Sequence, residues 1–486
     1  MQYFHISRVY MINAHKHIVA MALLCAFAFG DVAAQETEPS PWSRFGMGLT
    51  IPTLSSPQLM MGGVSSPIID GYVINPDQPA SAANCVSTLF QSSIHLNRSN
   101  MSEGDSTESV NYGSPGGFNL VVKKPGGSSA VMMGVIPYSA KGYNVSRTVE
   151  TDTLMGNYKE SYTGSGGTAK SYLGFAHSYK SKKWMPAGKS DSVLVGNRAV
   201  SLGAQVSFLS GEVISTSRLN IEDVTYLDHR SSSSMRHRSL SGLFGIQAFQ
   251  LLWANYDSDR SFKGSATLYL GATYSPKAKL FTDSERTIET VQFLSNVETV
   301  IDTASYTNQL DAQGLMPSKY SIGGAIVFEN ANGRRLLLAA DFMEEDWTVV
   351  SESSSEIDIL EGDATWAVAS RTSLGLTLNP RTDRSNNNVL SRSTFKSGFA
   401  LDLYPIAYKG NQLHGWRASA GVSVPLEGSR STSKVHFGFE MGQRGVGVEN
   451  GTVFEESLEE SLFSIQFGVT LAPFFKNLWL TPKLYD

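Results

Sequence analysis

The sequence predicts an all-β protein: a transmembrane antiparallel β-barrel of about 14 strands with an N-terminal plug in its lumen. Three observations predict this fold. The chain starts with an export signal, long segments alternate between apolar and polar residues, and an irregular stretch of glycine, proline and apolar residues precedes those segments. Together they divide the chain into a signal peptide (residues 1–34), a plug segment (35–84) and an outer-membrane barrel (85–486).

The first part of the chain has the features of a secretory signal peptide. Basic residues around Lys16 precede an apolar run from Ile18 to Gly30, and the small residues of Val-Ala-Ala at 32–34 form a cleavage site. We expect cleavage after Ala34. The apolar run is shorter than the roughly 20 residues that a membrane helix needs, so a helical anchor is the weaker alternative.

The composition excludes some functions. Charged residues make up only 17% of the chain and the net charge is -5, whereas a nucleic-acid-binding protein would present a basic face. We therefore expect no nucleic-acid partner. The two cysteines are Cys25 and Cys85. Because Cys25 lies in the signal peptide, the mature chain can form no internal disulfide, and Cys85 is expected to be a small structural residue.

The segment SFKGSATLYLGATYS, residues 261–275, shows the strand pattern most clearly. Apolar and polar residues alternate along it, which is typical of a β-strand with two different faces. Its twelve steps from Phe262 to Tyr274 exceed the usual strand length of about 5 or 6 residues in soluble proteins. At a tilt of about 40° they climb about 30 Å, close to the apolar band of an outer-membrane barrel. We therefore expect Leu268 and Leu270 to face lipid, with a soluble sandwich or propeller as the alternative.

Comparable alternation recurs along the rest of the chain, and no amphipathic helix of similar length appears. Further examples are residues 200–208, 395–404, 416–424, 434–441 and 463–471. A closed barrel suits such strands because it leaves no free edge exposed to lipid. The tight segment 329–333 (ENANG) predicts a hairpin turn. The long polar segments 282–316 and 351–361 are predicted to be solvated loops.

Residues 35–84 show little alternation. Prolines and glycines interrupt the segment, yet it carries Trp42, Phe45, Ile68 and other apolar residues that a disordered tail would lack. Irregular backbone at membrane depth is tolerated only inside protein or a water-filled cavity. We therefore expect this segment to fold inside the barrel and close its bore, with Gly62 and Gly63 as a hinge.

These features resemble the FadL/TodX-type outer-membrane transport proteins for hydrophobic compounds, in a divergent branch. Gly62-Gly63 lead to Asn75-Pro76, and Pro79-Ala80 follow before the first strand, as in the plug of that family. The contiguous Asn-Pro-Ala motif is split here by Asp77-Gln78. The resemblance implies passive transport of small, fatty-acid-like hydrophobic molecules across the cell outer membrane. The candidate ligand or plug residues are Met60, Met61, Gly62, Gly63, Asn75, Pro76, Pro79 and Ala80.

Alternatives to transport remain. The same branch borders on barrels that anchor or dock exported proteins of secretion systems, so a non-transporting docking barrel is the second expectation. Met60 and Met61 either adapt to apolar ligands, as methionines do, or pack the plug against the wall. The expected partners are outer-membrane lipid, the barrel-assembly machinery and a hydrophobic small-molecule ligand.

Catalytic signals are weak. No histidine pair has the spacing of a helical zinc site, and there is no Gly-x-Ser-x-Gly motif. Residues 95–100 (HLNRSN) only faintly suggest a lipid hydrolase. We expect that the protein is not an enzyme and that it binds no cofactor and no metal. Isolated charges on the polar strand faces are expected in the lumen, where they either pair across strands or line a polar conduit. These residues are Lys263, Lys396, Asp402, Arg417, Lys434 and Glu440.

Overall fold

The computed structural model describes residues 39–472, apart from 105, 125, 151–155, 188–190, 224, 295–296, 354–363, 381–388, 427–432 and 447–457. The predicted signal peptide, its cleavage site and the end of the chain lie outside the described residues. None of the described helices is long and apolar enough to span a membrane.

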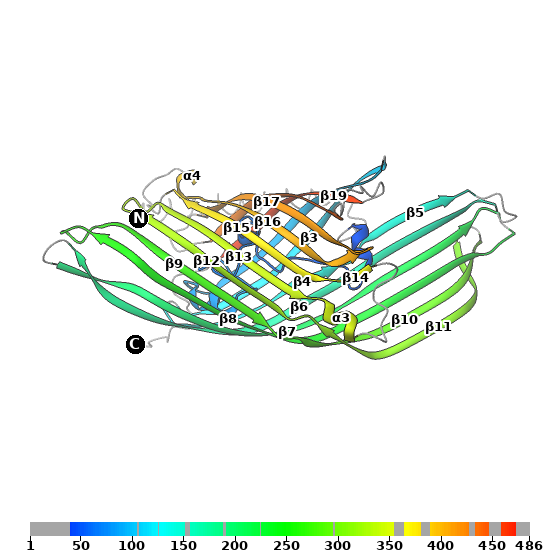
Figure 1. Ribbon diagram of the computed structural model, residues 1–486, viewed down its shortest axis with the longest axis horizontal. Helices are drawn as coiled ribbons and strands as arrows, with labels where there is room; N and C mark the ends of the chain where they lie inside the picture. Colours follow the sequence, from blue (N-terminus) through cyan, green and yellow to red (C-terminus); the bar gives the residue numbers. More distant parts are fainter. Residues whose placement is uncertain are drawn as a thin grey trace, which may run out of the picture. The chain divides into compact units, whose positions relative to one another are not determined.

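Fourteen antiparallel strands of the described chain pair in a closed ring, which confirms the predicted barrel (Figure 1). The ring closes because β19 pairs with β2 from Phe90 to Ser102. In ring order the strands are β2 (Leu89–Glu103), β3 (Ser106–Lys123), β4 (Ser129–Ala140), β6 (Tyr158–Ala187), β7 (Asp191–Ile221), β8 (Asp228–Tyr256), β9 (Phe262–Ser275), β12 (Lys319–Asn330), β13 (Arg335–Asp346), β15 (Val368–Asn379), β16 (Thr394–Tyr408), β17 (Asn411–Pro425), β18 (Lys434–Val446) and β19 (Glu459–Leu471).

The remaining elements are short or lie beyond the ring. The segment before β2 holds the 3₁₀ helices η1 (Pro41–Arg44) and η2 (Pro79–Asn84), the short strand β1 (Leu49–Thr50) and the helix α2 (Ser56–Leu59). The others are β5 (Tyr143–Val149), β10 (Ala278–Leu294), β11 (Val297–Met316), α3 (Thr348–Ser353), β14 (Ala364–Trp366) and α4 (Val389–Arg392).

Strand β9 has the predicted facing. Leu270 and Tyr274 are exposed on the outside of the ring, at 51% and 53%. Between them, Gly271 and Thr273 are buried toward the lumen, where Gly271 contacts Ser66. Because side chains alternate between the faces of a strand, Leu268 lies on the same outer face as Leu270. The apolar face of the strand is therefore the surface that a bilayer would cover.

The segment 282–316 is not the predicted loop. It forms most of the hairpin β10–β11, and β10 pairs with residues 228–239 of β8. Together with β5 and the adjoining parts of β6, β7 and β8, the hairpin makes a sheet that continues beyond the ring (Figure 1). We call this sheet the extension sheet. Cross-strand ion pairs hold its polar face, including Arg230–Glu289 at 2.6 Å and Arg238–Asp283 at 2.9 Å.

The two ends of the ring differ. At the end where β2 starts and β19 stops, several connections are short, such as 124–128 between β3 and β4, and 331–334 between β12 and β13. The latter is the predicted hairpin turn, closed by a hydrogen bond from the Gly333 amide to the Asn330 carbonyl. The extension sheet lies at the other end. Since barrels have short periplasmic turns and longer outer loops, we assign the short-turn end to the periplasm.

Candidate functional site: the plug segment and the wall around it

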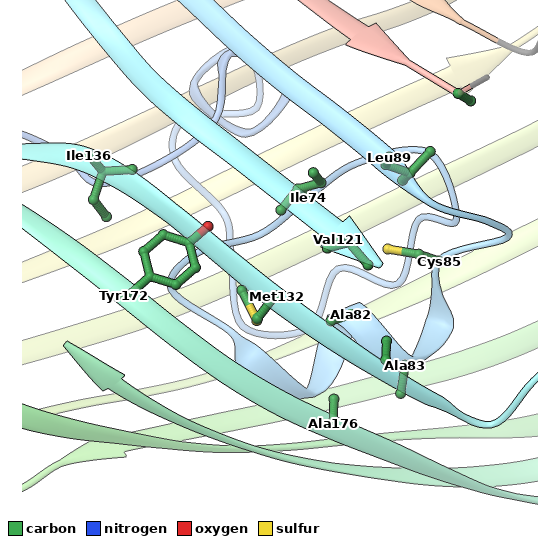
Figure 2. Close-up of a cluster of buried hydrophobic side chains, with 12 residues drawn as sticks. Ile74, Ala82, Ala83, Cys85, Leu89, Val121, Met132, Ile136, Tyr172 and Ala176 are labelled. Atoms are coloured by element: carbon green, nitrogen blue, oxygen red, sulfur yellow. The ribbon is translucent and has the colours of Figure 1, made fainter. Parts of the chain in front are cut away.

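The described residues before β2, 39–88, contain most of the predicted plug and are packed against the lumen faces of the barrel strands. From here on we call residues 39–88 the plug segment. Their buried apolar side chains join those of the wall in continuous clusters. In Figure 2, Ile74, Ala82 and Cys85 of the plug segment lie among Val121, Met132 and Tyr172 and other wall residues. The wall therefore buries the apolar residues that a free tail would expose.

The backbone of the plug segment lies in direct contact with lumen-facing glycines of the wall. A Cβ atom added to Gly271 would come within 1.8 Å of the Ser66 carbonyl oxygen, and one on Gly398 within 2.0 Å of the Met61 carbonyl carbon. The same holds for Gly203, at 2.4 Å from the Ala80 nitrogen, and for Gly375, at 2.9 Å from the Met61 oxygen. Any side chain at these positions would push the plug segment away. We call these four residues the glycine seat.

The Met60-Met61-Gly62-Gly63 turn lies at the centre of this contact. Met60 and Met61 are fully buried, and the Met60 side chain covers Gly421 of β17 and Gly438 of β18. Gly62 and Gly63 both have positive φ, at 68° and 83°. A Cβ atom on Gly62 would meet the Phe399 backbone at 2.6 Å. The turn thus needs glycine both for its backbone conformation and for its close approach to the wall.

The other predicted plug residues are also buried. Asn75 holds the plug segment together: its side-chain amide donates to the Ser65 carbonyl oxygen at 3.0 Å, and its side-chain oxygen accepts from the Asp77 amide at 3.2 Å. Pro76 follows it. Pro79 and Ala80 begin η2, which lies against β6, β7 and β8. These residues shape the plug segment, and a ligand role for them stays a prediction.

Polar groups of the wall anchor the plug segment. The Asp341 carboxylate of β13 accepts hydrogen bonds from the backbone amides of Ser65 and Ser66, at 2.8 and 3.0 Å, and from the Ser66 hydroxyl. The Lys123 ammonium donates to the Cys85 carbonyl oxygen at 2.6 Å. Near the start of the segment, the Ser40 hydroxyl donates to Glu460 of β19 at 2.8 Å. These bonds give backbone groups of the plug segment the partners that burial requires.

Two titratable residues of the plug segment, Asp77 and Cys85, each keep a single protonation state at neutral pH. Burial alone would raise the pKa of the Asp77 carboxyl, but the Lys319 ammonium 3.4 Å away and the Thr53 hydroxyl together lower this pKa below 3.8. Asp77 is therefore charged at neutral pH and attracts the plug segment to β12. Burial raises the pKa of the Cys85 thiol to about 12, so this thiol stays neutral.

The predicted lumen charges do not form one group. Arg417 contacts Asp402 at 2.7 Å and Glu440 at 3.4 Å, and Arg371 contacts Asp402 at 2.6 Å. Two lysines instead contact the plug segment. The Lys396 ammonium donates to the Pro57 carbonyl oxygen at 3.3 Å, and that of Lys434 lies over the ring of Tyr72 at 4.8 Å.

Lys263 lies apart from these charges. It is exposed and pairs with Asp257 in the β8–β9 turn at 3.0 Å. The residues predicted for the lumen therefore fall into a cross-strand network, two contacts to the plug segment and an ion pair at the periplasmic rim.

A break in the barrel wall was not expected from the sequence. Strand β4 pairs with β3 only between Ala130 and Val135, opposite residues 118–123. Above this point Ser139 and Ala140 of β4 pair with β1 of the plug segment, while residues 106–117 of β3 pair only with β2 among the described strands. Gly117 has a φ of 85° at the point of separation. The Pro-Gly-Gly of residues 115–117 is the sequence signal that marks it.

Little space remains where the plug segment meets β9, β12, β13 and β15. A cavity there has a volume of about 20 Å³ and is lined by Asp77, Lys319 and Asp341 and by neighbouring polar residues. A volume of this size holds about one water molecule. This cavity therefore has no room for a hydrophobic ligand.

Comparison with known proteins assigns the family. The family model described as BamG matches residues 11–480. The chain belongs to the BamG family. No curated protein has significant sequence similarity to this BamG-family barrel.

Several solved structures are similar to the BamG-family chain. The Pseudomonas putida toluene transporter TodX has 14% identity and a TM-score of 0.49, over 86% of this chain and 98% of TodX. A Pseudomonas aeruginosa FadL homologue has 11% identity and a TM-score of 0.47, over 88% of this chain and 100% of the homologue. The Ralstonia pickettii toluene transporter TbuX has 13% identity and a TM-score of 0.44, over 87% and 98% of the two chains.

Proposed function

We propose that this protein is a non-conducting outer-membrane barrel that docks other proteins, and that it works with the barrel-assembly machinery. The observation that carries the proposal is the glycine seat, where the backbone of the plug segment lies directly on the backbone of the wall. Well-packed interfaces of this kind do not rearrange without breaking many contacts at once. The plug segment and the wall therefore act as one body.

Two further features support docking. The extension sheet carries surface beyond the membrane band, and within the described chain residues 297–309 of β11 pair as a strand only with β10, so this part of β11 forms an edge of the sheet, whereas α3 packs against β11. A free edge is a template on which another chain can add a strand. The BamG family description, whose prefix denotes barrel-assembly machinery, supports that machinery as the partner.

The wall break favours a second function, the passive transport of small hydrophobic molecules. Between β3 and β4 the ladder of hydrogen bonds stops, and β1 of the plug segment pairs with β4 beside the gap, so an apolar molecule could leave the lumen sideways into the bilayer between β3 and the plug segment. The names of the toluene transporters agree with this candidate. Its fatty-acid-like substrate stays a proposal, as does the absence of catalysis.

Retrieval of a tagged protein from solubilised outer membranes tests the docking proposal. We expect the barrel-assembly machinery to be recovered with the full-length chain. A variant in which residues 284–309 are replaced by a short Gly-Asn turn should keep its heat-modifiable gel migration but recover less of the machinery. The matched control is a variant in which the turn at residues 331–334 is replaced by the same Gly-Asn turn; it should recover as much of the machinery as the full-length chain.

Two other results would reject docking in favour of its rivals. Recovery of the protein alone, with saturable uptake of toluene or a fatty acid into proteoliposomes, would support transport. Release of fatty acid from phospholipid by the purified protein would support the hydrolase.

A further inference from the structure

The outer face of the barrel carries an apolar groove that the docking function does not use. It has a volume of about 560 Å³ and crosses β6, β7, β8 and β9. Its floor is made of small residues, including Ala204 and Ala272, and its sides of Phe175, Leu202, Phe244 and Tyr274. Phe175 and Phe244 flank Ala204 in the strand register, so one aromatic ring lies on each side of the Ala204 methyl group.

The groove opens onto the surface that faces hydrocarbon. Its side residues are exposed on the outside of the ring, with Phe175 at 55% and Phe244 at 54%. Water does not fill an apolar cavity in such a position. Acyl chains are the molecules that surround this face of the barrel.

A cationic pair lies at the periplasmic end of the same strands. Arg198 of β7 and Lys182 of β6 are both exposed, and neither forms an ion pair with the residues that the structure describes. Arg198 lies opposite Ser181 of β6 and Gln250 of β8, on the same outer face as Leu202 and Ala204. Trp184, two positions beyond Lys182 toward the periplasmic end, is exposed and pairs with the exposed Leu194, so the cations lie beside an aromatic residue of the kind that marks a membrane interface.

The spacing between the cations and the groove fits one lipid molecule. Ala204 lies six positions after Arg198 along β7, which is about 20 Å of strand and about 15 Å of membrane depth at a tilt of about 40°. One leaflet of a bilayer contributes half of a hydrocarbon core about 30 Å thick. An acyl chain in the groove would therefore place its headgroup at Arg198 and Lys182.

We propose that this groove is a binding site for an anionic phospholipid of the inner leaflet, with one acyl chain in the groove and the phosphate held by Arg198 and Lys182. Aromatic side walls and a floor of small residues give an acyl chain contact on three sides. The two cations favour an anionic headgroup over a zwitterionic one. The groove lies on the outer face of the wall, opposite the plug segment, and Gly203 borders both; lipid binding does not depend on the docking function.

Native mass spectrometry of the delipidated full-length barrel tests the headgroup contact. Titration with dioleoylphosphatidylglycerol should give one retained lipid, and dioleoylphosphatidylcholine should bind more weakly. The double variant Arg198→Gln/Lys182→Gln should lower the phosphatidylglycerol affinity about tenfold or more, because charge-assisted hydrogen bonds are lost. The control Arg334→Gln/Lys409→Gln removes the same charge from turns elsewhere and should leave the affinity unchanged.

Filling the groove tests the acyl-chain contact. Ala204→Phe should weaken the binding of both lipids, whereas Ala420→Phe on the outer face of β17 should not. Equal lipid binding by Ala204→Phe and the wild type would overturn the proposal. A photo-cross-linker at position 202 should capture phospholipid in cells. Capture of a protein in place of lipid would also overturn the proposal and make the groove a protein interface.

Discussion

Gly398 of β16 lies directly against Met61 of the plug segment: a Cβ atom on Gly398 would approach the Met61 carbonyl carbon to 2.0 Å. The two residues are separated by most of the barrel in sequence, yet their backbones are in contact. This relationship explains why the wall carries glycine where strand propensity would favour a larger residue. It also leads to direct tests of the plug segment as a fixed part of the barrel.

Gly398→Ala should loosen the plug segment while the barrel still folds. The added methyl group collides with backbone, which cannot rotate away, so we expect a cost of about 1–3 kcal/mol in the stability of the seated state. Limited proteolysis should cut the plug segment faster than in the wild type. The matched control is Gly324→Ala of β12, where the nearest atom to an added Cβ is Leu270 Cδ2 at 3.6 Å. Equal cleavage of the two variants would contradict the glycine seat.

Asp341→Asn should weaken the anchor of Ser65 and Ser66. An asparagine of similar size keeps one acceptor oxygen but removes the charge, and hydrogen bonds to charged groups contribute about 1.5–3 kcal/mol. Hydrogen exchange at the two serine amides should become faster. Asp311→Asn, which removes an exposed partner of Arg238 in the extension sheet, should change stability by about 1 kcal/mol or less. Unchanged exchange in Asp341→Asn would show that the carboxylate does not anchor the plug segment.

The contribution of Asp77 should depend on pH. Because the folded-state pKa of Asp77 is lowered, its charge stabilises the seated plug segment above pH 3.8, and this stabilisation is lost as the pH falls through the folded-state pKa. Thermal unfolding at pH 7 should therefore show a lower Tm for Asp77→Asn than for the wild type. The difference should shrink as the pH is lowered below 3.8. A difference that is constant with pH would rule out the Asp77–Lys319 attraction as its source.

Leu270→Arg and Leu310→Arg should differ in their cost to the free energy of folding into a bilayer, although both leucines are exposed, at 51% and 68%. Leu270 lies on the apolar band, where arginine costs about 2–4 kcal/mol at the bilayer midplane. Leu310 lies on β11 in the extension sheet and faces water, so its replacement should cost little. Folding titrations into phospholipid vesicles measure both. A larger cost at Leu310 would place the extension sheet in the membrane.

The sequence predicted the strands that have one apolar and one polar face. Residues 262–275 belong to this class, because lipid on one side and lumen on the other impose alternation. Strands β10 and β11 escaped prediction, because charged and hydroxyl side chains lie on both of their faces and leave no alternating pattern, although Leu280 and Met316 are buried. Their Thr, Val, Ile and Tyr residues were the remaining signal.

The candidate site was only partly predictable. The apolar residues of the plug segment demanded burial, and the lumen was the one place available. Nothing in the sequence shows which wall residue meets which plug residue, because Gly271 and Ser66 are brought together only by barrel closure. The separation of β3 from β4 could likewise not be read from the sequence, because it depends on how the strands pair in the closed barrel, although Pro115 and Gly116 mark a weak point in β3.

The most direct test of a docking barrel with a fixed plug is partner recovery after the plug segment has been locked to the wall. A Cβ atom on Gly468 would lie 3.1 Å from Ser56 Cβ, near the usual disulfide separation of about 3.5–4.5 Å. The variant Ser56→Cys/Gly468→Cys therefore allows locking by oxidation and release by reduction. We predict that the oxidised and reduced proteins recover equal amounts of the barrel-assembly machinery from solubilised membranes. Recovery by the reduced protein only, or by neither form, would contradict the account.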